Sequence, residues 1–92
     1  MPARIRMTNV VNHEDERSVM AAIERVFIER DGDWRVSIWC DNQNGIWTLT
    51  VNGPNSYLWE RDLIGEDGAQ EPEFIANAIE DALPQVADPN EL

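Results

Sequence analysis

The sequence predicts an α+β fold, a two-layer sandwich in which both helices cover one face of an antiparallel sheet. Apolar residues recur at helical spacing in one segment near each end of the chain, and they alternate at strand spacing between those segments. Turn signals divide the alternating region into three strands. The expected order is an optional strand, a helix, three strands and a helix, because each element must bury its apolar face against the other layer.

The first helix follows a weakly patterned start. Residues 4–11 alternate between apolar and polar side chains, which predicts either a short strand or an N-terminal arm over the core, within residues 1–12. Asn12 can cap a helix, and the acidic residues 14–16 suit the positive end of its dipole. The helix is expected over residues 13–30, with one apolar stripe: Val19, Met20, Ile23, Val26 and Phe27.

The next two strands form a hairpin. Residues 34–41 and 46–51 alternate, and the loop over residues 42–45 ends in the Asn-Gly pair typical of tight hairpins. A loop of two or four residues puts the same side chains in the core: Val36, Ile38, Cys40, Trp47, Leu49 and Val51. Trp39 therefore lies on the opposite face, since a one-residue slip would exchange the two faces.

A third strand is expected over residues 57–64, after a turn at residues 53–56. The alternation divides its side chains between the two faces of the sheet. Tyr57, Trp59 and Leu63 are expected to face inward. Leu58, Glu60 and Asp62 are expected to face outward.

The second helix begins near Pro72, which suits a first helical position, after an acidic loop over residues 65–68. Its apolar stripe is Ile75, Ala78, Ile79, Ala82 and Leu83. Pro84 disfavours helical geometry at Leu83, so the helix should end there. Residues 1–84 are thus expected to form a single domain, and residues 85–92 a mobile acidic tail.

The charges are unevenly distributed along the chain. The net charge is -11, all seven basic residues are arginines, and none of them follows Arg61. Such a chain repels nucleic acid at long range, so direct binding of DNA or RNA is not expected. The same charge attracts a basic protein surface, although solubility is the simpler reason for it.

The cysteine content and the hydropathy pattern bear on the compartment. Cys40 is the only cysteine, so no internal disulfide can form and a reducing compartment is expected. Arg4 and Arg6 interrupt any apolar run at the start of the chain, and no segment is long enough to cross a membrane. These features predict a cytoplasmic protein that does not bind membranes.

Residues suited to catalysis are scarce, so the sequence does not predict an enzyme. His13 is the only histidine, Cys40 is expected in the core, and the chain has no lysine. The acidic loop at residues 65–68 is too short for a calcium loop of the EF-hand type, and no glycine-rich phosphate loop occurs. No catalytic residue, metal or cofactor is therefore expected.

The sequence favours a non-enzymatic protein-binding module that docks on a basic protein surface. An inhibitor that occupies the nucleic-acid site of another protein is one form of such a module. Trp39 is a separate candidate anchor, because an aromatic residue within a polar rim is typical of interfaces. The candidate contact residues are Trp39, Glu60, Asp62, Glu66, Asp67, Glu71, Glu73, Glu80 and Asp81.

Two alternatives remain open for the exposed apolar residues. The chain could be a structural or accessory homodimer without ligand chemistry, in which copies pair through open sheet faces or edge strands. Alternatively, the N-terminal arm could cover Trp39 with Met7 and Val10.

Overall fold

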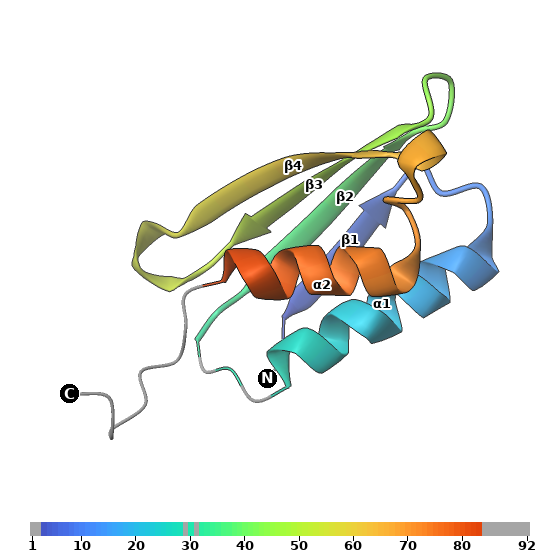
Figure 1. The fold of residues 1–92 in the computed structure, drawn as a ribbon. Helices are drawn as coiled ribbons and strands as arrows, with labels where there is room; N and C mark the ends of the chain where they lie inside the picture. The colour runs from blue at the N-terminus through green and yellow to red at the C-terminus, as the bar shows by residue number, and fades with distance from the viewer. Residues whose placement is uncertain (1–2, 29, 31, 84–92) are drawn as a thin grey trace.

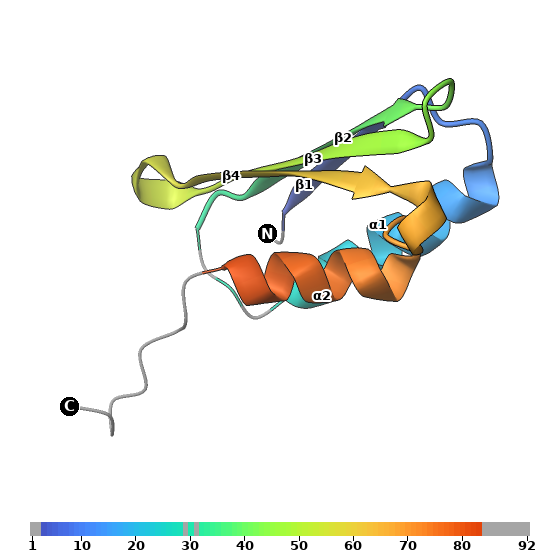
Figure 2. The ribbon, with the colours of Figure 1, turned by 45° about the horizontal axis from the view of Figure 1, so that its top comes forward.

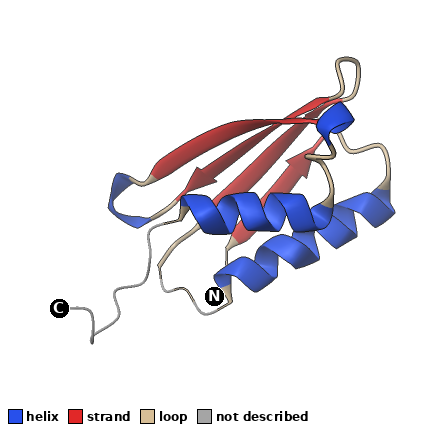
Figure 3. Ribbon diagram, in the orientation of Figure 1, coloured by secondary structure: helices blue, strands red, loops and turns tan. Residues whose placement is uncertain are grey.

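The computed structural model of the chain describes residues 3–28, 30 and 32–83. It shows a four-stranded sheet and two α-helices, which confirms the predicted α+β class (Figures 1 and 3). The elements follow one another as β1 (Arg4–Thr8), α1 (His13–Phe27), β2 (Arg35–Asp41), β3 (Ile46–Asn52), β4 (Leu58–Ile64) and α2 (Pro72–Ala82). Two short 3-10 turns, η1 (Pro54–Ser56) and η2 (Gly65–Asp67), flank β4. The acidic tail predicted at residues 85–92 lies outside the described residues.

The sheet is mixed, so the prediction of an antiparallel sheet was wrong in one pairing. The strand order is β1-β2-β3-β4, and β1 runs parallel to β2 while the other two pairs are antiparallel. The cause is the connection: α1 carries the chain back along the sheet, so the strands on either side of it point the same way. Residues 4–8 thus form a strand of the sheet and not an arm.

The hairpin register follows the sequence prediction. Val36 pairs with Val51, Ile38 with Leu49, and Cys40 with Trp47. These pairs belong to one core that also includes side chains of both helices, among them Ile23, Phe27, Ile75 and Ile79. Figures 1 and 2 show α1 and α2 on the same side of the sheet.

The start of α1 agrees with the prediction and its end does not. The Asn12 side chain accepts hydrogen bonds from the backbone N–H groups of Glu14 (2.9 Å) and Asp15 (3.4 Å). The helix ends at Phe27 and not at Arg30, whose N–H donates to the Phe27 carbonyl at 3.0 Å in a tighter turn. The chain reverses early because Phe27 and Trp34 pack against each other in the core.

Trp34 anchors the end of the molecule where this reversal occurs. Its ring lies 5.3 Å from Phe27 and 5.5 Å from Tyr57, centroid to centroid. Gly53 packs directly on the indole, because a Cβ atom at this position would lie 2.9 Å from Cη2 and closer still to two other ring atoms. The side chain of Trp34 is therefore held between the turn before β4 and the end of α1.

The second helix ends close to the predicted position. The last helical residue of α2 is Ala82, and Leu83 takes extended backbone. The Tyr57 hydroxyl donates to the Ala82 carbonyl oxygen at 2.7 Å, which ties the end of α2 to the start of β4. Tyr57 itself precedes β4, which begins at Leu58.

Candidate functional site

The first candidate surface is the face of the sheet that points away from the two helices (Figure 2). We call it the open sheet face, and the alternation of the strands places every second residue on it. Its members are Arg4, Arg6 and Thr8 on β1; Arg35, Ser37, Trp39 and Asp41 on β2; Ile46, Thr48, Thr50 and Asn52 on β3; and Leu58, Glu60, Asp62 and Ile64 on β4. None of these residues is buried.

Trp39 lies on a central strand of this face, and its side chain is 54% exposed. The neighbouring strands place Thr8 and Thr48 beside it, and Asp62 pairs with Thr48 on the far side. The Thr48 hydroxyl donates to Asp62 at 3.3 Å. The structure thus brings together three of the predicted contact residues: Trp39, Glu60 and Asp62.

The N-terminal segment does not cover Trp39, so that alternative was wrong. Met7 pairs with Ile38 on the inner side of the sheet, and both Met7 and Val10 pack against the core. A shallow hollow of about 260 Å³ opens next to Trp39, and its lining includes Arg6, Ser37, Thr48 and Thr50.

Charge changes sign from one edge of the open sheet face to the other. Arg4 and Arg6 stand on the edge strand β1, while Glu60 and Asp62 stand on the opposite edge strand β4. Three strand spacings of ~4.8 Å separate these edges by about 14 Å, which is too far for an ion pair within one chain. No ion pair involves these four side chains among the residues that the structure describes.

The arginine side of this face was not among the contact residues predicted from the sequence. Arg4, Arg6 and Arg35 were not candidates, because the segment that carries the first two had no assigned pairing partner. One signal could have identified them: both arginines alternate with Ile5 and Met7, which are the apolar residues of the same strand.

The other predicted contact residues lie elsewhere, on η2, on the start of α2 and along α2. We call this second group the acidic helix surface: Glu66, Asp67, Glu71, Glu73, Glu80 and Asp81. All of these side chains are exposed, and within residues 3–28, 30 and 32–83 none of them forms an ion pair. The predicted contact residues are therefore divided between two surfaces.

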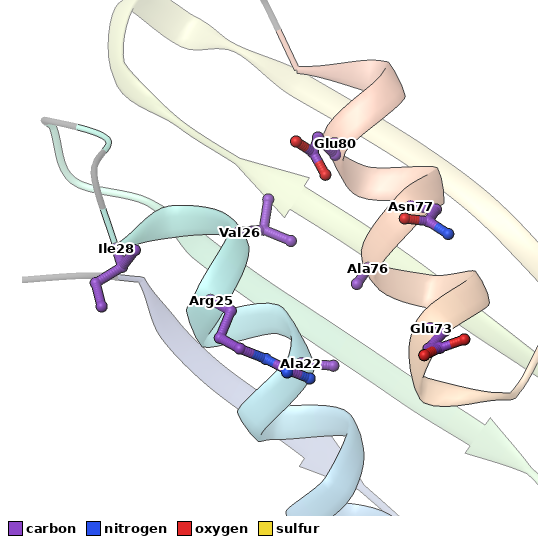
Figure 4. A pocket seen from close by; sticks show the side chains of 8 residues that line it. All are labelled: Ala22, Arg25, Val26, Ile28, Glu73, Ala76, Asn77 and Glu80. Carbon is purple, nitrogen blue, oxygen red and sulfur yellow. The ribbon is translucent and has the colours of Figure 1, made fainter.

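Two members of the acidic helix surface line a groove between the helices. The groove holds about 520 Å³, and Figure 4 shows Glu73 and Glu80 on α2, with Arg25 on α1 and Ile28 directly after the end of α1. Ile28 is 72% exposed. The α1 side of this groove was not predicted, because the pairing of the two helices is a long-range contact that neither apolar stripe specifies.

Further acidic residues lie next to the acidic helix surface, at the start of α1. Asp15 and Glu71 line a common hollow of about 240 Å³ that also includes Trp47. Asp15 belongs to a run of carboxylates that stabilises the positive end of α1. The starts of the two helices thus bring their acidic residues to one end of the molecule.

The residues suited to catalysis lie apart from one another. Cys40 is fully buried, and burial, followed by the charge of Glu16, raises the pKa of its thiol above the ordinary value. His13 is exposed at the start of α1, where its Nδ1 lies 3.3 Å from Glu16. No group of three or more histidine, cysteine or carboxylate side chains in the described part of the chain is arranged to hold a metal ion.

The fold and the two surfaces define an α+β protein with an open, charged sheet face and an acidic helix layer. No protein-family model matches the sequence, and searches of curated proteins and of solved structures found no significant match. Among the described residues, no helix is long and apolar enough to cross a membrane.

Proposed function

We propose that this chain is a non-enzymatic protein-binding module whose acidic helix surface docks on a basic protein surface in the cytoplasm. One observation carries the proposal: the six carboxylates of this surface are exposed and have no cationic ion-pair partner among the described residues. Three of the seven arginines lie instead on the open sheet face, on the other side of the molecule.

Such a concentration of like charge destabilises the folded chain by self-repulsion, and a cationic partner would relieve it. Exposed ion pairs contribute only about 0.2–1 kcal/mol each, so the main effects would be faster association and a fixed orientation. The apolar side chains of the groove, Val26 and Ile28, would supply contact area beside the charges. A basic nucleic-acid-binding groove matches this pattern, so an inhibitor of a nucleic-acid-binding protein is the form we favour.

The test is affinity capture from a lysate of the source cells, at about 0.1 M and about 1 M salt, with captured proteins identified by mass spectrometry. The Debye length falls from about 10 Å to about 3 Å over this range, so a partner held by the acidic surface should be lost. The triple variant Glu73→Gln, Glu80→Gln and Asp81→Asn should lose the same partner at low salt.

A matched variant removes the same number of charges elsewhere, by Glu24→Gln, Glu60→Gln and Asp62→Asn, and it should still capture the partner. Equal loss in both variants would show that the acidic helix surface is not specifically responsible for capture, and would contradict the proposal. Capture that is unchanged at high salt, or no captured protein at low salt, would contradict the proposal.

A further inference from the structure

The open sheet face carries complementary charges on its two edges, and a single chain cannot pair them. Across the four strands, one register row runs Arg6, Ser37, Thr50 and Glu60. The next row runs Thr8, Trp39, Thr48 and Asp62. Each row is therefore cationic or neutral at β1 and anionic at β4, with small hydroxyl side chains and one tryptophan between the edges.

Two copies of such a face can stack with their strands aligned in only two twofold arrangements, and charge distinguishes them. An axis across the strands would place β1 over β1 and β4 over β4, so that arginines would face arginines and acids would face acids. An axis parallel to the strands would place β1 over the partner's β4 and β2 over the partner's β3. Aligned packing, with about 30° between strand directions, is the common arrangement of stacked sheets.

We propose that the open sheet face binds a second copy of this chain, in a homodimer whose twofold axis runs parallel to the strands between β2 and β3. The axis preserves position along the strands, so register rows coincide. Arg6 then lies over the partner's Glu60, and Thr8 lies over the partner's Asp62. Each contact occurs twice, as an isologous interface requires.

Trp39 occupies the centre of this interface. The axis lies midway between β2 and β3, so β2 of one copy stacks on β3 of the other. Trp39 and Thr48 share a register row, and each Trp39 therefore lies over the partner's Thr48. The partner's Thr48 also lines the hollow next to the partner's own Trp39. Exposed aromatic residues at the centre of an interface carry most of its binding energy, whereas rim charges mainly fix orientation. The pairs formed by Arg6 are on the rim, because β1 and β4 are the edges of the sheet.

The size of the face predicts a weak dimer. Four strands and five to seven residues of length give a flat area of roughly 400 Å² per copy. This is below the ~800 Å² per partner of a standard stable interface, so we expect a dissociation constant in the micromolar range or weaker. The net charge of -11 on each copy also opposes association at low salt.

The test is sedimentation equilibrium of the full chain at about 0.15 M salt, where the Debye length is about 8 Å. The wild-type chain should change reversibly, with rising concentration, from 10.5 kDa to twice that mass. Trp39→Ser should weaken dimerisation on the order of 10- to 100-fold. Arg6→Glu alone and Glu60→Arg alone should each weaken it, because each variant places like charges over one another.

The decisive sample is an equimolar mixture of the Arg6→Glu and Glu60→Arg variants. The proposed axis pairs the glutamates of one chain with the arginines of the other at both sites, so the mixture should dimerise more tightly than either variant alone. Arg17→Glu, on the exposed side of α1, makes the same change in charge outside the face and should dimerise as the wild type does.

A wild-type chain that stays monomeric at millimolar concentration would overturn the proposal, and so would a dimer that is indifferent to Trp39→Ser. A mixture that stays monomeric would refute the axis. The substituted positions are exposed or on edge strands, so the variants are expected to fold. Far-ultraviolet circular dichroism of each variant checks this. The proposal is independent of acidic docking, since Arg6→Glu should still capture a salt-sensitive partner.

Discussion

Replacing Gly53 with alanine tests how tightly the turn before β4 packs on Trp34. The backbone of Gly53 has φ -144°, which alanine adopts without strain, so in the folded chain the effect comes from the contacts of the added methyl group. That methyl would overlap three atoms of an indole that is only 6% exposed and is packed against Phe27 and Tyr57. The ring cannot move away without displacing one of these neighbours.

The expected loss of stability follows from two opposing effects. Overpacking of a well-filled core costs about 1–3 kcal/mol. Alanine also restricts the unfolded chain, which stabilises the protein by about 0.4–1 kcal/mol. We therefore expect Gly53→Ala to lower the free energy of unfolding by about 1–2 kcal/mol.

Urea unfolding followed by circular dichroism and tryptophan fluorescence measures this loss. With a urea dependence of about 1 kcal/mol per molar, the midpoint should fall by roughly 1–2 M. Gly65→Ala is the milder comparison, because its Cβ would approach only the Gln70 side-chain amide, at 3.2 Å, and not an aromatic ring. That amide donates to the carbonyls of Gly45 and Leu63, so a small shift of these two hydrogen bonds is the expected cost. In a Trp34→Phe background the loss should shrink, since the smaller ring leaves room for the methyl.

An equal loss at Gly65 and Gly53, or an unchanged loss in the Trp34→Phe background, would refute the proposed contact. An alanine at Gly53 that left stability unchanged would refute it as well.

Three further predictions concern single side chains. Tyr57→Phe should lower the free energy of unfolding by about 1 kcal/mol in urea unfolding, because it removes the hydrogen bond to the Ala82 carbonyl; equal stability would show that this bond contributes nothing. Burial raises the pKa of the Cys40 thiol, so the folded chain keeps its proton above pH 9.0 while the unfolded chain loses it. Stability should therefore fall as pH rises past 9.0, and the slope of stability against pH should be shallower in Cys40→Ala. Hydrogen bonds from Asn44 lower the pKa of Asp41 below 3.8, so stability should fall with pH below that value, and acid titration of Asp41→Asn should show a smaller fall.

The elements that local chemistry determines could be predicted from the sequence. The cap at Asn12 and the Asn-Gly turn act on neighbouring residues, and they place the start of α1 and the hairpin correctly. The parallel pairing of β1 could not be predicted in this way, because the direction of that strand depends on where α1 returns the chain. The early end of α1 likewise depends on the contact between Phe27 and Trp34, which only the folded chain contains.

The candidate surfaces show the same division. The exposure of Trp39 follows from the alternation of side chains between the two faces of a strand, and the structure agrees with it. The position of Arg6 in one row with Glu60 follows from three strand pairings, one of which spans α1. The sequence therefore indicates which residues are exposed, but not which of them share a surface.

The charged edge strand β4 has a consequence for how copies of this chain can meet. Unpaired edge strands are templates for further strands and so for aggregation. Here Glu60, Arg61 and Asp62 follow one another at the edge, and Arg61 points to the inner side, where its guanidinium lies 5.3 Å from the Phe74 ring. A strand added to β4 would have to pack its side chains beside this cation on the inner side of the sheet. We therefore expect β4 to resist the growth of the sheet into fibrils even where the chain is concentrated.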